Sequence, residues 1–246
     1  MENPDPNPPR PVSYHNRTGH ILLPEHNIIQ QQFDKLEAFA NEHEMQINMK
    51  KTKVMLFNTR KRYDFQPKII NEGGEVLDVE EEMKLLGVKI SSDLSWHSNT
   101  KLICSKGYTR LWLLRNLKKY GTNMWDLKDV YEKQVRSVLE MAVPAWEPGL
   151  TKNEANQIER VQRTACAIIL GTNYKSYSKA LITLELETLA DRRKSLCLTF
   201  AKKALKNEKF QDWFIESESG GSTTLKEVEA RTKRYRRSPH EWISTV

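Results

Sequence analysis

The sequence has few cysteines, and they are not grouped. Three occur among the 246 residues, Cys104, Cys166 and Cys197, and they lie far apart within helical patterns. This spacing matches neither a disulfide framework nor a zinc knuckle, and it is typical of a chain in a reducing compartment. We therefore expect each cysteine to be a small apolar core residue.

The sequence also lacks long apolar segments. No stretch is long and apolar enough to span a membrane, and the chain does not start with the basic and apolar regions of a signal peptide. Five of the ten prolines fall within the first eleven residues, which predicts a disordered tail over residues 1–27. We expect an intracellular protein, in the nucleus or the cytoplasm, with no membrane partner.

Positive charge exceeds negative charge and is unevenly placed. The chain has 39 basic and 32 acidic residues, a net charge of +7, which makes polyanions plausible partners. Between Leu94 and Trp125 there is no acidic residue. The same stretch contains six bases, Lys101, Lys106, Arg110, Arg115, Lys118 and Lys119. Such side chains neutralise phosphates, so this stretch is a candidate nucleic-acid-binding surface.

Residues 28–90 combine one helical pattern with short strand patterns. Ile29, Phe33, Leu36 and Ala40 recur at helical spacing, which predicts a helix that ends near His43. Strands are predicted at residues 45–48, 54–57 and 84–90, and a turn at residues 71–74 should form a β-hairpin. Gly87 interrupts the last strand pattern and indicates a bulge or a close backbone approach.

From Asp93 onward the apolar period is helical. Four stripes predict four helices, and the third should end at Gly171. The short connections between them indicate an antiparallel bundle. The tryptophans are expected as core or junction residues of it: Trp112, Trp125, Trp146 and Trp213.

Several motifs follow one another in a recognisable order. The pattern Ile47-Asn48-x-x-Lys51-Thr52-x-x-Met55-x-Phe57 precedes Leu85-Leu86-Gly87-Val88-Lys89-Ile90-Ser91, Asp93-Leu94 and Trp96. Downstream come Arg115-Asn-Leu-Lys118, Glu159-Arg-Val-Gln-Arg163, Leu189-Ala-Asp-Arg-Arg-Lys194 and Arg234-Tyr-Arg-Arg-Ser-Pro239. Over roughly residues 28 to 242 the chain resembles the C-terminal part of the reverse transcriptase of jockey-like non-LTR retrotransposons.

The resemblance implies a fold of the α+β class that is mostly α. It implies a truncated reverse-transcriptase palm of short antiparallel strands plus one helix, then a helical thumb and a helical C-terminal region. The corresponding ranges are residues 28–96 for the partial palm, 97–150 for the thumb, 151–218 for the C-terminal helices and 219–246 for a basic tail.

The resemblance also assigns candidate site residues. Asn48, Lys51 and Thr52 would belong to the motif beside the incoming nucleotide, and Leu86 and Gly87 to a turn like the primer grip. The thumb follows this turn and, in the family, tracks the primer-template duplex. Its candidate nucleic-acid-binding residues are Lys106, Arg110, Arg115, Lys118 and Lys119, and the basic tail adds Arg234, Arg236 and Arg237.

The catalytic half of the palm has no counterpart in the sequence. Enzymes of this family are RNA-directed DNA polymerases that hold two magnesium ions with aspartates, one pair of them in an aromatic-x-Asp-Asp turn. No Asp-Asp pair occurs anywhere in this chain. We therefore assign no catalytic residue, no metal ligand and no cofactor, and we do not expect the chain to polymerise DNA by itself.

Non-specific binding of RNA, DNA or an RNA–DNA hybrid is the function that these observations favour. A protein that covers the incomplete palm is a further expected partner, because a missing half leaves strand edges and apolar surface exposed. Two alternatives stay open. In the first, the chain is a retrotransposon remnant without function or a helical protein-interaction module. In the second, it is a fragment of a longer active reverse transcriptase.

Overall fold

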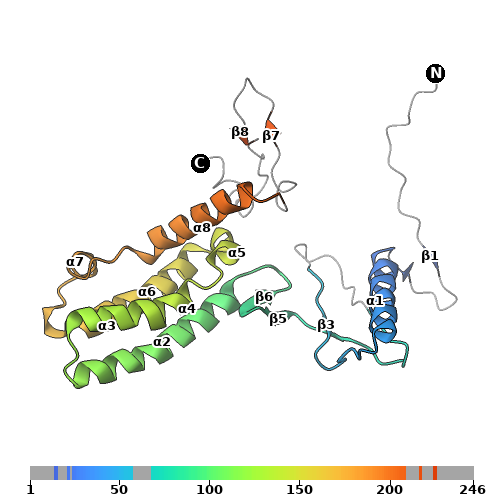
Figure 1. Ribbon diagram of the computed structural model, residues 1–246, viewed down its shortest axis with the longest axis horizontal. Coiled ribbons are helices and arrows are strands. Elements are labelled where there is room, and N and C mark those ends of the chain that lie inside the picture. The colour runs from blue at the N-terminus through green and yellow to red at the C-terminus, as the bar shows by residue number, and fades with distance from the viewer. Residues whose placement is uncertain are drawn as a thin grey trace. The chain divides into compact units, whose positions relative to one another are not determined.

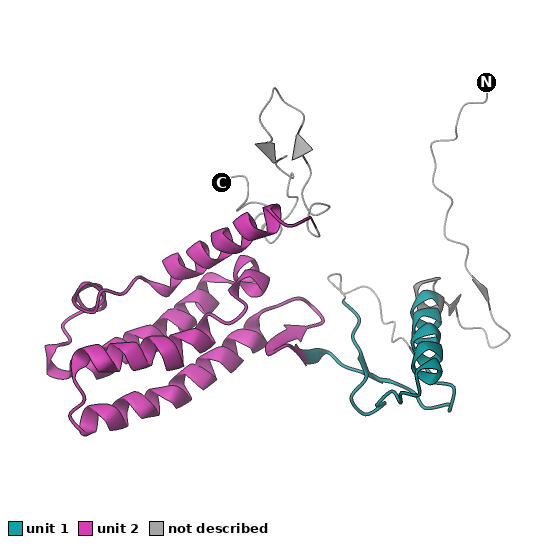
Figure 2. Cartoon of the chain, in the orientation of Figure 1, with its two compact units in different colours: residues 1–83 teal, residues 84–246 magenta. Residues whose placement is uncertain are grey.

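The computed structural model describes residues 14–15, 21–22, 24–57, 68–208, 216–217 and 224–225, and the side chains of residues 28–57 and 68–208. The fold is α+β and mostly helical, as the sequence predicts. The chain divides into two compact units, residues 1–83 and 84–246 (Figure 2). The division falls inside the range that the resemblance gives to the partial palm.

Unit 1 contains one long helix and several two-residue strands. Helix α1 (Pro24–Glu42) follows the antiparallel strands β1 (Tyr14–His15) and β2 (Ile21–Leu22). Strands β3 (Lys53–Val54) and β4 (Asp78–Val79) complete the unit. Helix α1 confirms the helical pattern, and its end at Glu42 is one residue from the predicted end.

A small apolar cluster and a side-chain amide hold unit 1 together. Phe33 of α1 packs with Ile69 and Leu77, all buried. Gln30 of α1 donates from Nε2 to the carbonyl oxygen of Ile70 at 2.7 Å and accepts from the Ile70 amide at 3.0 Å. The Gln30 amide thus satisfies both backbone groups of Ile70, as a neighbouring strand would.

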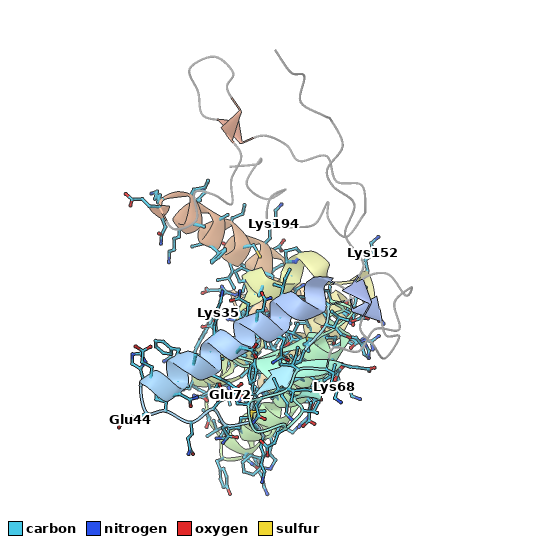
Figure 3. The ribbon with its side chains drawn as sticks, turned by 90° about the vertical axis from the view of Figure 1, so that its right-hand side faces the viewer. Lys35, Glu44, Lys68, Glu72, Lys152 and Lys194 are labelled. Carbon is cyan, nitrogen blue, oxygen red and sulfur yellow. The ribbon has the colours of Figure 1, made fainter. Side chains whose placement is uncertain are left out.

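The loop after Ile70 turns back beside α1. Gly74 donates to the carbonyl oxygen of Asn71, and Ile70 forms an antiparallel bridge with Val76, which confirms the predicted hairpin turn. The Glu72 amide donates to a carboxylate oxygen of Glu37 on α1 at 3.2 Å. Figure 3 shows α1 with Lys35 along it, Glu44 just beyond its end and Glu72 nearby.

The strands of unit 1 differ from the sequence prediction. Strand β3 pairs with β4 in parallel, not antiparallel. Residues 45–48 form no strand, and the strand expected at 54–57 is reduced to Lys53–Val54. The long connection between β3 and β4 permits the parallel pairing, because parallel strands need a crossover of a dozen or more residues.

A hairpin whose first strand begins two residues before unit 2 leads into the helices of that unit (Figure 1). Strands β5 (Glu82–Leu85) and β6 (Val88–Ser91) pair with each other. The helices that follow are α2 (His97–Lys119), α3 (Met124–Val130), the π-helix η1 (Tyr131–Arg136), α4 (Ser137–Leu139), α5 (Val143–Trp146), η2 (Glu147–Gly149), α6 (Lys152–Leu170), η3 (Gly171–Asn173), α7 (Tyr177–Thr183) and α8 (Leu189–Leu205). Two further short strands pair antiparallel, β7 (Glu216–Ser217) and β8 (Thr224–Leu225).

Capping residues fix the ends of these helices. Thr151 and Glu154 form a reciprocal capping box at the start of α6, in which the Thr151 amide donates to Glu154 Oε2 at 2.7 Å. Asn123 caps α3 and Thr188 caps α8 through their side-chain oxygens. Gly171 follows the last residue of α6 with a positive φ of 57°, so the predicted end of the third helix is confirmed.

The core of unit 2 lies between α2, α6 and the segments η1, α5 and α8. Ile103, Leu111 and Leu114 of α2 are buried in it with Ile158 and Ile169 of α6. The three cysteines are buried and free, as predicted. None of the helices in the part of the chain that the structure describes combines the length and the apolar character needed to cross a membrane.

Candidate nucleic-acid interface

Helix α2 lies at the edge of the bundle in Figure 1, and its buried residues lie along one side. That side is apolar and meets α6 and α4 closely. A Cβ atom at Gly107 would lie 3.0 Å from Leu139 Cδ2 and 3.0 Å from Val161 Cγ1. Glycine at this position therefore lets α2 approach its neighbours, and the other faces of the helix stay open to solvent.

The predicted cations of α2 do not share one face. Residues four apart lie on the same side of a helix, so Lys106 and Arg110 form one group and Arg115 and Lys119 another. Arg110 Nη1 donates to the carbonyl oxygen of Gln134 in η1. Arg110 thus helps to join α2 to the π-helix in addition to carrying charge.

Lys118 points in a third direction. Its Nζ atom donates to the carbonyl oxygen of Ile169 at 2.6 Å, close to the C-terminal end of α6. A cation there satisfies a terminal carbonyl and complements the partial negative charge of the helix end. Lys118 is therefore a structural residue of the bundle as well as a candidate phosphate contact.

Among the five candidate cations of α2, Arg115 and Lys119 are the ones that are exposed and make no structural hydrogen bond in the described part of the chain. Within the described ranges, no hydrogen bond or ion pair joins either side chain to another residue. No acidic side chain lies on α2, so nothing on the helix neutralises them. These two side chains are free to meet phosphate groups.

Two aromatic side chains share this surface. Trp112 is 66% exposed and Tyr108 is 41% exposed on α2. Of the two places expected for the tryptophans, core or junction, the core is therefore wrong for Trp112 and for Trp125, which is 49% exposed in the first turn of α3. Trp146 is fully buried as expected, and Trp213 lies outside the described residues.

The turn between β5 and β6 is a tight two-residue connection. Leu86 and Gly87 both have positive φ, 47° and 91°. Positive φ at both central residues is what a type I′ hairpin turn requires. The position that the sequence suggested as a bulge is thus the tip of a hairpin, with Leu86 almost fully exposed at 94%.

Gly87 also lies close to Met141, which follows α4. A Cβ atom at Gly87 would be 2.9 Å from Met141 Cε. The close approach expected at Gly87 is therefore present, and it is made with the side chain of Met141. The Leu86–Gly87 turn is held against the helical bundle at this point.

Asn48, Lys51 and Thr52 lie in a single turn of unit 1. Asn48 Oδ1 accepts from the Lys51 amide at 3.1 Å, and the Asn48 carbonyl oxygen accepts from Thr52 Oγ1 at 3.0 Å. Asn48 and Thr52 thus bond the local backbone. The Lys51 side chain is exposed.

Arg192 and Arg193 are engaged inside the bundle. Arg192 Nη2 donates to Glu140 Oε2 at 2.9 Å, and a second bond from Arg192 Nε reaches the other carboxylate oxygen. Arg193 is only 2% exposed and donates from Nε to Glu147 Oε2 at 2.7 Å. Burial raises the pKa of the Glu147 carboxyl, and Arg193 opposes that rise. These arginines fasten α8 to the segments before α6.

The Glu-Arg-Val-Gln-Arg segment of α6 is likewise structural. Glu159 accepts from the Tyr177 hydroxyl and from the Leu189 amide, the latter at 3.1 Å. Gln162 donates to the Tyr177 hydroxyl oxygen at 2.9 Å and to the Glu187 carbonyl oxygen at 2.8 Å. These bonds connect α6 with α7 and α8. Burial is the main cause of the raised pKa of Tyr177, so its hydroxyl stays protonated.

The remaining candidates add no site to those above. Arg234, Arg236 and Arg237 lie outside the described residues. Within residues 28–57 and 68–208, no three His, Cys, Asp or Glu side chains are grouped so that they could hold a metal ion. No family of known proteins, no curated protein and no solved structure matches the chain.

Proposed function

We propose that this chain binds nucleic acid without sequence specificity through α2, and that it derives from the C-terminal part of a retrotransposon reverse transcriptase. The observation that carries the proposal is the charge of α2. This helix has no acidic residue, and Arg115 and Lys119 extend from it without a partner in the described part of the chain. Cations of this kind bind phosphates by releasing counterions.

The ancestry rests on the order of the motifs and on how they relate to the fold. The Leu86–Gly87 hairpin comes directly before the long basic helix, which is the order in which a primer grip and a thumb follow each other. In this proposal the partial palm lies in unit 1 and at the start of unit 2. Polymerisation is not proposed, because no Asp-Asp pair is present to hold two catalytic metal ions.

Charge reversal on α2 tests the proposed binding. The variant Lys106→Glu, Arg115→Glu, Lys119→Glu removes three exposed or half-exposed cations that make no described structural bond. Its control reverses three exposed lysines outside α2, Lys152, Lys175 and Lys179, and reaches the same net charge of +1, which is +7 minus six. Affinity for a fluorescent primer–template hybrid should fall in the α2 variant and stay near the wild-type value in the control. Equal losses in the two variants would contradict the proposal.

Unit 1 supports a second proposal, which concerns a protein partner. Its apolar cluster is small, while Leu36 and Phe39 on α1 and Met45 after it are each about half exposed. Neighbouring exposed apolar side chains mark interaction surfaces. We infer that a protein covers this side of α1. The variant Leu36→Ser, Phe39→Ser should remain folded and lose that partner in pull-down experiments, with Lys35→Ser as the matched surface control.

A further inference from the structure

The outward face of α2 carries aromatic and basic side chains in one row. Lys101, Tyr108, Trp112, Arg115 and Lys119 follow each other at intervals of three, four or seven residues, so they line one side of the helix. All five side chains are exposed. At the rise of an α-helix the row is about 27 Å long. We refer to these five residues as the α2 stripe.

The stripe lies away from the packed side of α2. Ile103, Gly107, Leu111 and Leu114 are buried and face the other helices of unit 2. In the part of the chain that the structure describes, no ring contact or cation–π pair involves Tyr108 or Trp112. Trp125 differs in this respect, because Lys128 Nζ lies 5.4 Å from the centre of its ring. The rings of Tyr108 and Trp112 thus have no aromatic or cationic partner in this part of the chain, and Trp112 is 66% exposed.

The order of charges and rings along the stripe indicates what binds it. A cation lies on each side of the aromatic pair, Lys101 before it and Arg115 and Lys119 after it, and no acidic residue interrupts the helix. A surface for an apolar protein partner has no need of three unopposed cations. Phosphates repeat along a nucleic-acid strand, and the bases between them have faces that stack on aromatic rings.

Exposed aromatic rings distinguish single strands from duplexes. In a duplex the bases already stack on each other, so a tryptophan on a helix surface gains little from them. An unpaired strand presents base faces, and stacking on them is tolerant of sequence. We propose that the α2 stripe is a stacking platform for single-stranded nucleic acid, with Trp112 and Tyr108 contacting bases and Lys101, Arg115 and Lys119 contacting phosphates. This inference rests on the proposed nucleic-acid binding and names its substrate class.

The test compares aromatic and charge variants of the full chain on two probes. The probes are a short fluorescent oligodeoxythymidylate and the duplex that it forms with oligodeoxyadenylate of equal length. Trp112→Ala should lower affinity for the single strand about 5-fold or more and leave duplex binding nearly unchanged, because one stacked base is lost. Trp112→Phe should restore most of the loss. Trp125→Ala is the control, since it removes an exposed tryptophan outside the stripe.

Each outcome separates the stacking platform from the proposed function. If Trp112→Ala and Tyr108→Ala bind the single strand as the wild type does, while Arg115→Glu with Lys119→Glu weakens both probes, charge binding stands and stacking is overturned. If all four substitutions leave both probes unaffected, the stacking platform and the proposed binding both fail. If Trp112→Ala changes the oligomeric state instead of the affinity, the stripe is a contact between copies and the inference is wrong.

Discussion

At the scale of single residues, the free energy of unfolding depends on unfavourable backbone conformations and on buried charges, and single substitutions measure each contribution. Leu86 is the clearest case, because a leucine at the tip of a hairpin has a positive φ of 47° while its side chain is almost fully exposed. A left-handed conformation costs a non-glycine residue about 1–2 kcal/mol. Burial of the side chain does not offset that cost.

The first prediction concerns this turn. Leu86→Asn should stabilise the protein by about 1 kcal/mol, because asparagine tolerates a positive φ and prefers hairpin turns. Urea unfolding followed by tryptophan fluorescence measures the change. Leu86→Val is the matched variant and should destabilise the protein, because a β-branched residue is poorly suited to positive φ. If Leu86→Asn were less stable than the wild type, the Leu86 side chain would have to make a stabilising contact despite its exposure, which would contradict the prediction.

The second prediction concerns the buried pair Arg193–Glu147. Removing one partner of a buried ion pair costs about 3–5 kcal/mol, because the other charge is left without compensation. Glu147→Gln should therefore destabilise the protein strongly, since the Arg193 guanidinium cannot lose its charge. The double variant Glu147→Leu, Arg193→Met should recover most of that loss in urea unfolding. A double variant as unstable as Glu147→Gln would show that Arg193 acts through its shape and not its charge.

At the scale of elements, the contact of α2 with its neighbours depends on one glycine. Gly107 has ordinary helical geometry, yet a Cβ atom there would lie 3.0 Å from both Leu139 and Val161. Gly107→Val adds three carbon atoms where there is no room. Overpacking of this kind costs about 1–3 kcal/mol.

The third prediction uses a second position of the same helix as its control. Gly107→Val should lower the free energy of unfolding by about 1–3 kcal/mol through overpacking. Ser105→Val places the same side chain at an exposed site of α2 and should have an effect within about 0.5 kcal/mol. Thermal unfolding by circular dichroism compares the two. Equal effects would mean that the valine side chain is accommodated at position 107 without overpacking.

The sequence predicted where the helices lie better than it predicted which of their residues face the core. The apolar spacing of Leu127, Val130, Tyr131, Val135 and Val138 predicts a regular α-helix, but the π-helix η1 (Tyr131–Arg136) inserts a wider turn. The fully buried residues are therefore Leu127, Tyr131, Val135 and Leu139, each four apart, and Val138 is only half-buried. A π-helix turn has no apolar signature of its own, so periodicity cannot place it.

The candidate site was predictable in its charge and not in its geometry. The absence of acidic residues on α2 is visible in the sequence, whereas the engagement of Lys118 with Ile169 and of Arg110 with Gln134 depends on tertiary packing. The exposure of Trp112 was missed because tryptophan is usually well buried. Its position in the row of Lys101, Arg115 and Lys119 was the signal that could have revealed it.

At the scale of the whole molecule, the two units differ in the size of their cores. Unit 1 has three buried apolar residues in its cluster, Phe33, Ile69 and Leu77. The core of unit 2 extends through α2, α6 and α8, and its three cysteines lie on those helices. Burial raises the pKa of Cys104 to about 11 and the pKa values of Cys166 and Cys197 to about 12.

The fourth prediction uses these thiols as probes of the opening of unit 2. At pH 9 the folded thiols are protonated and covered, so iodoacetamide should modify them far more slowly than in urea, as mass spectrometry would show. The pKa of an unfolded thiol is 9.0, which is below the pKa of each of the three thiols in the folded protein. The folded state therefore binds more protons above pH 9, and the cysteine contribution to stability should be lost as pH rises from 9 towards 11. A cysteine that reacts in the folded protein as fast as in urea would contradict its burial.

The central claim is that α2 binds nucleic acid through its charge, and the salt dependence of binding tests it most directly. The measurement is the affinity for the primer–template hybrid across a salt series, for the wild type and for Lys106→Glu, Arg115→Glu, Lys119→Glu. The account predicts a linear fall of log affinity with log salt and a slope that is smaller by about two in the variant, one for each phosphate contact of Arg115 and Lys119, because Lys106 lies on another face of α2. A wild-type affinity that is independent of salt, or equal slopes for the wild type and the variant, would contradict it.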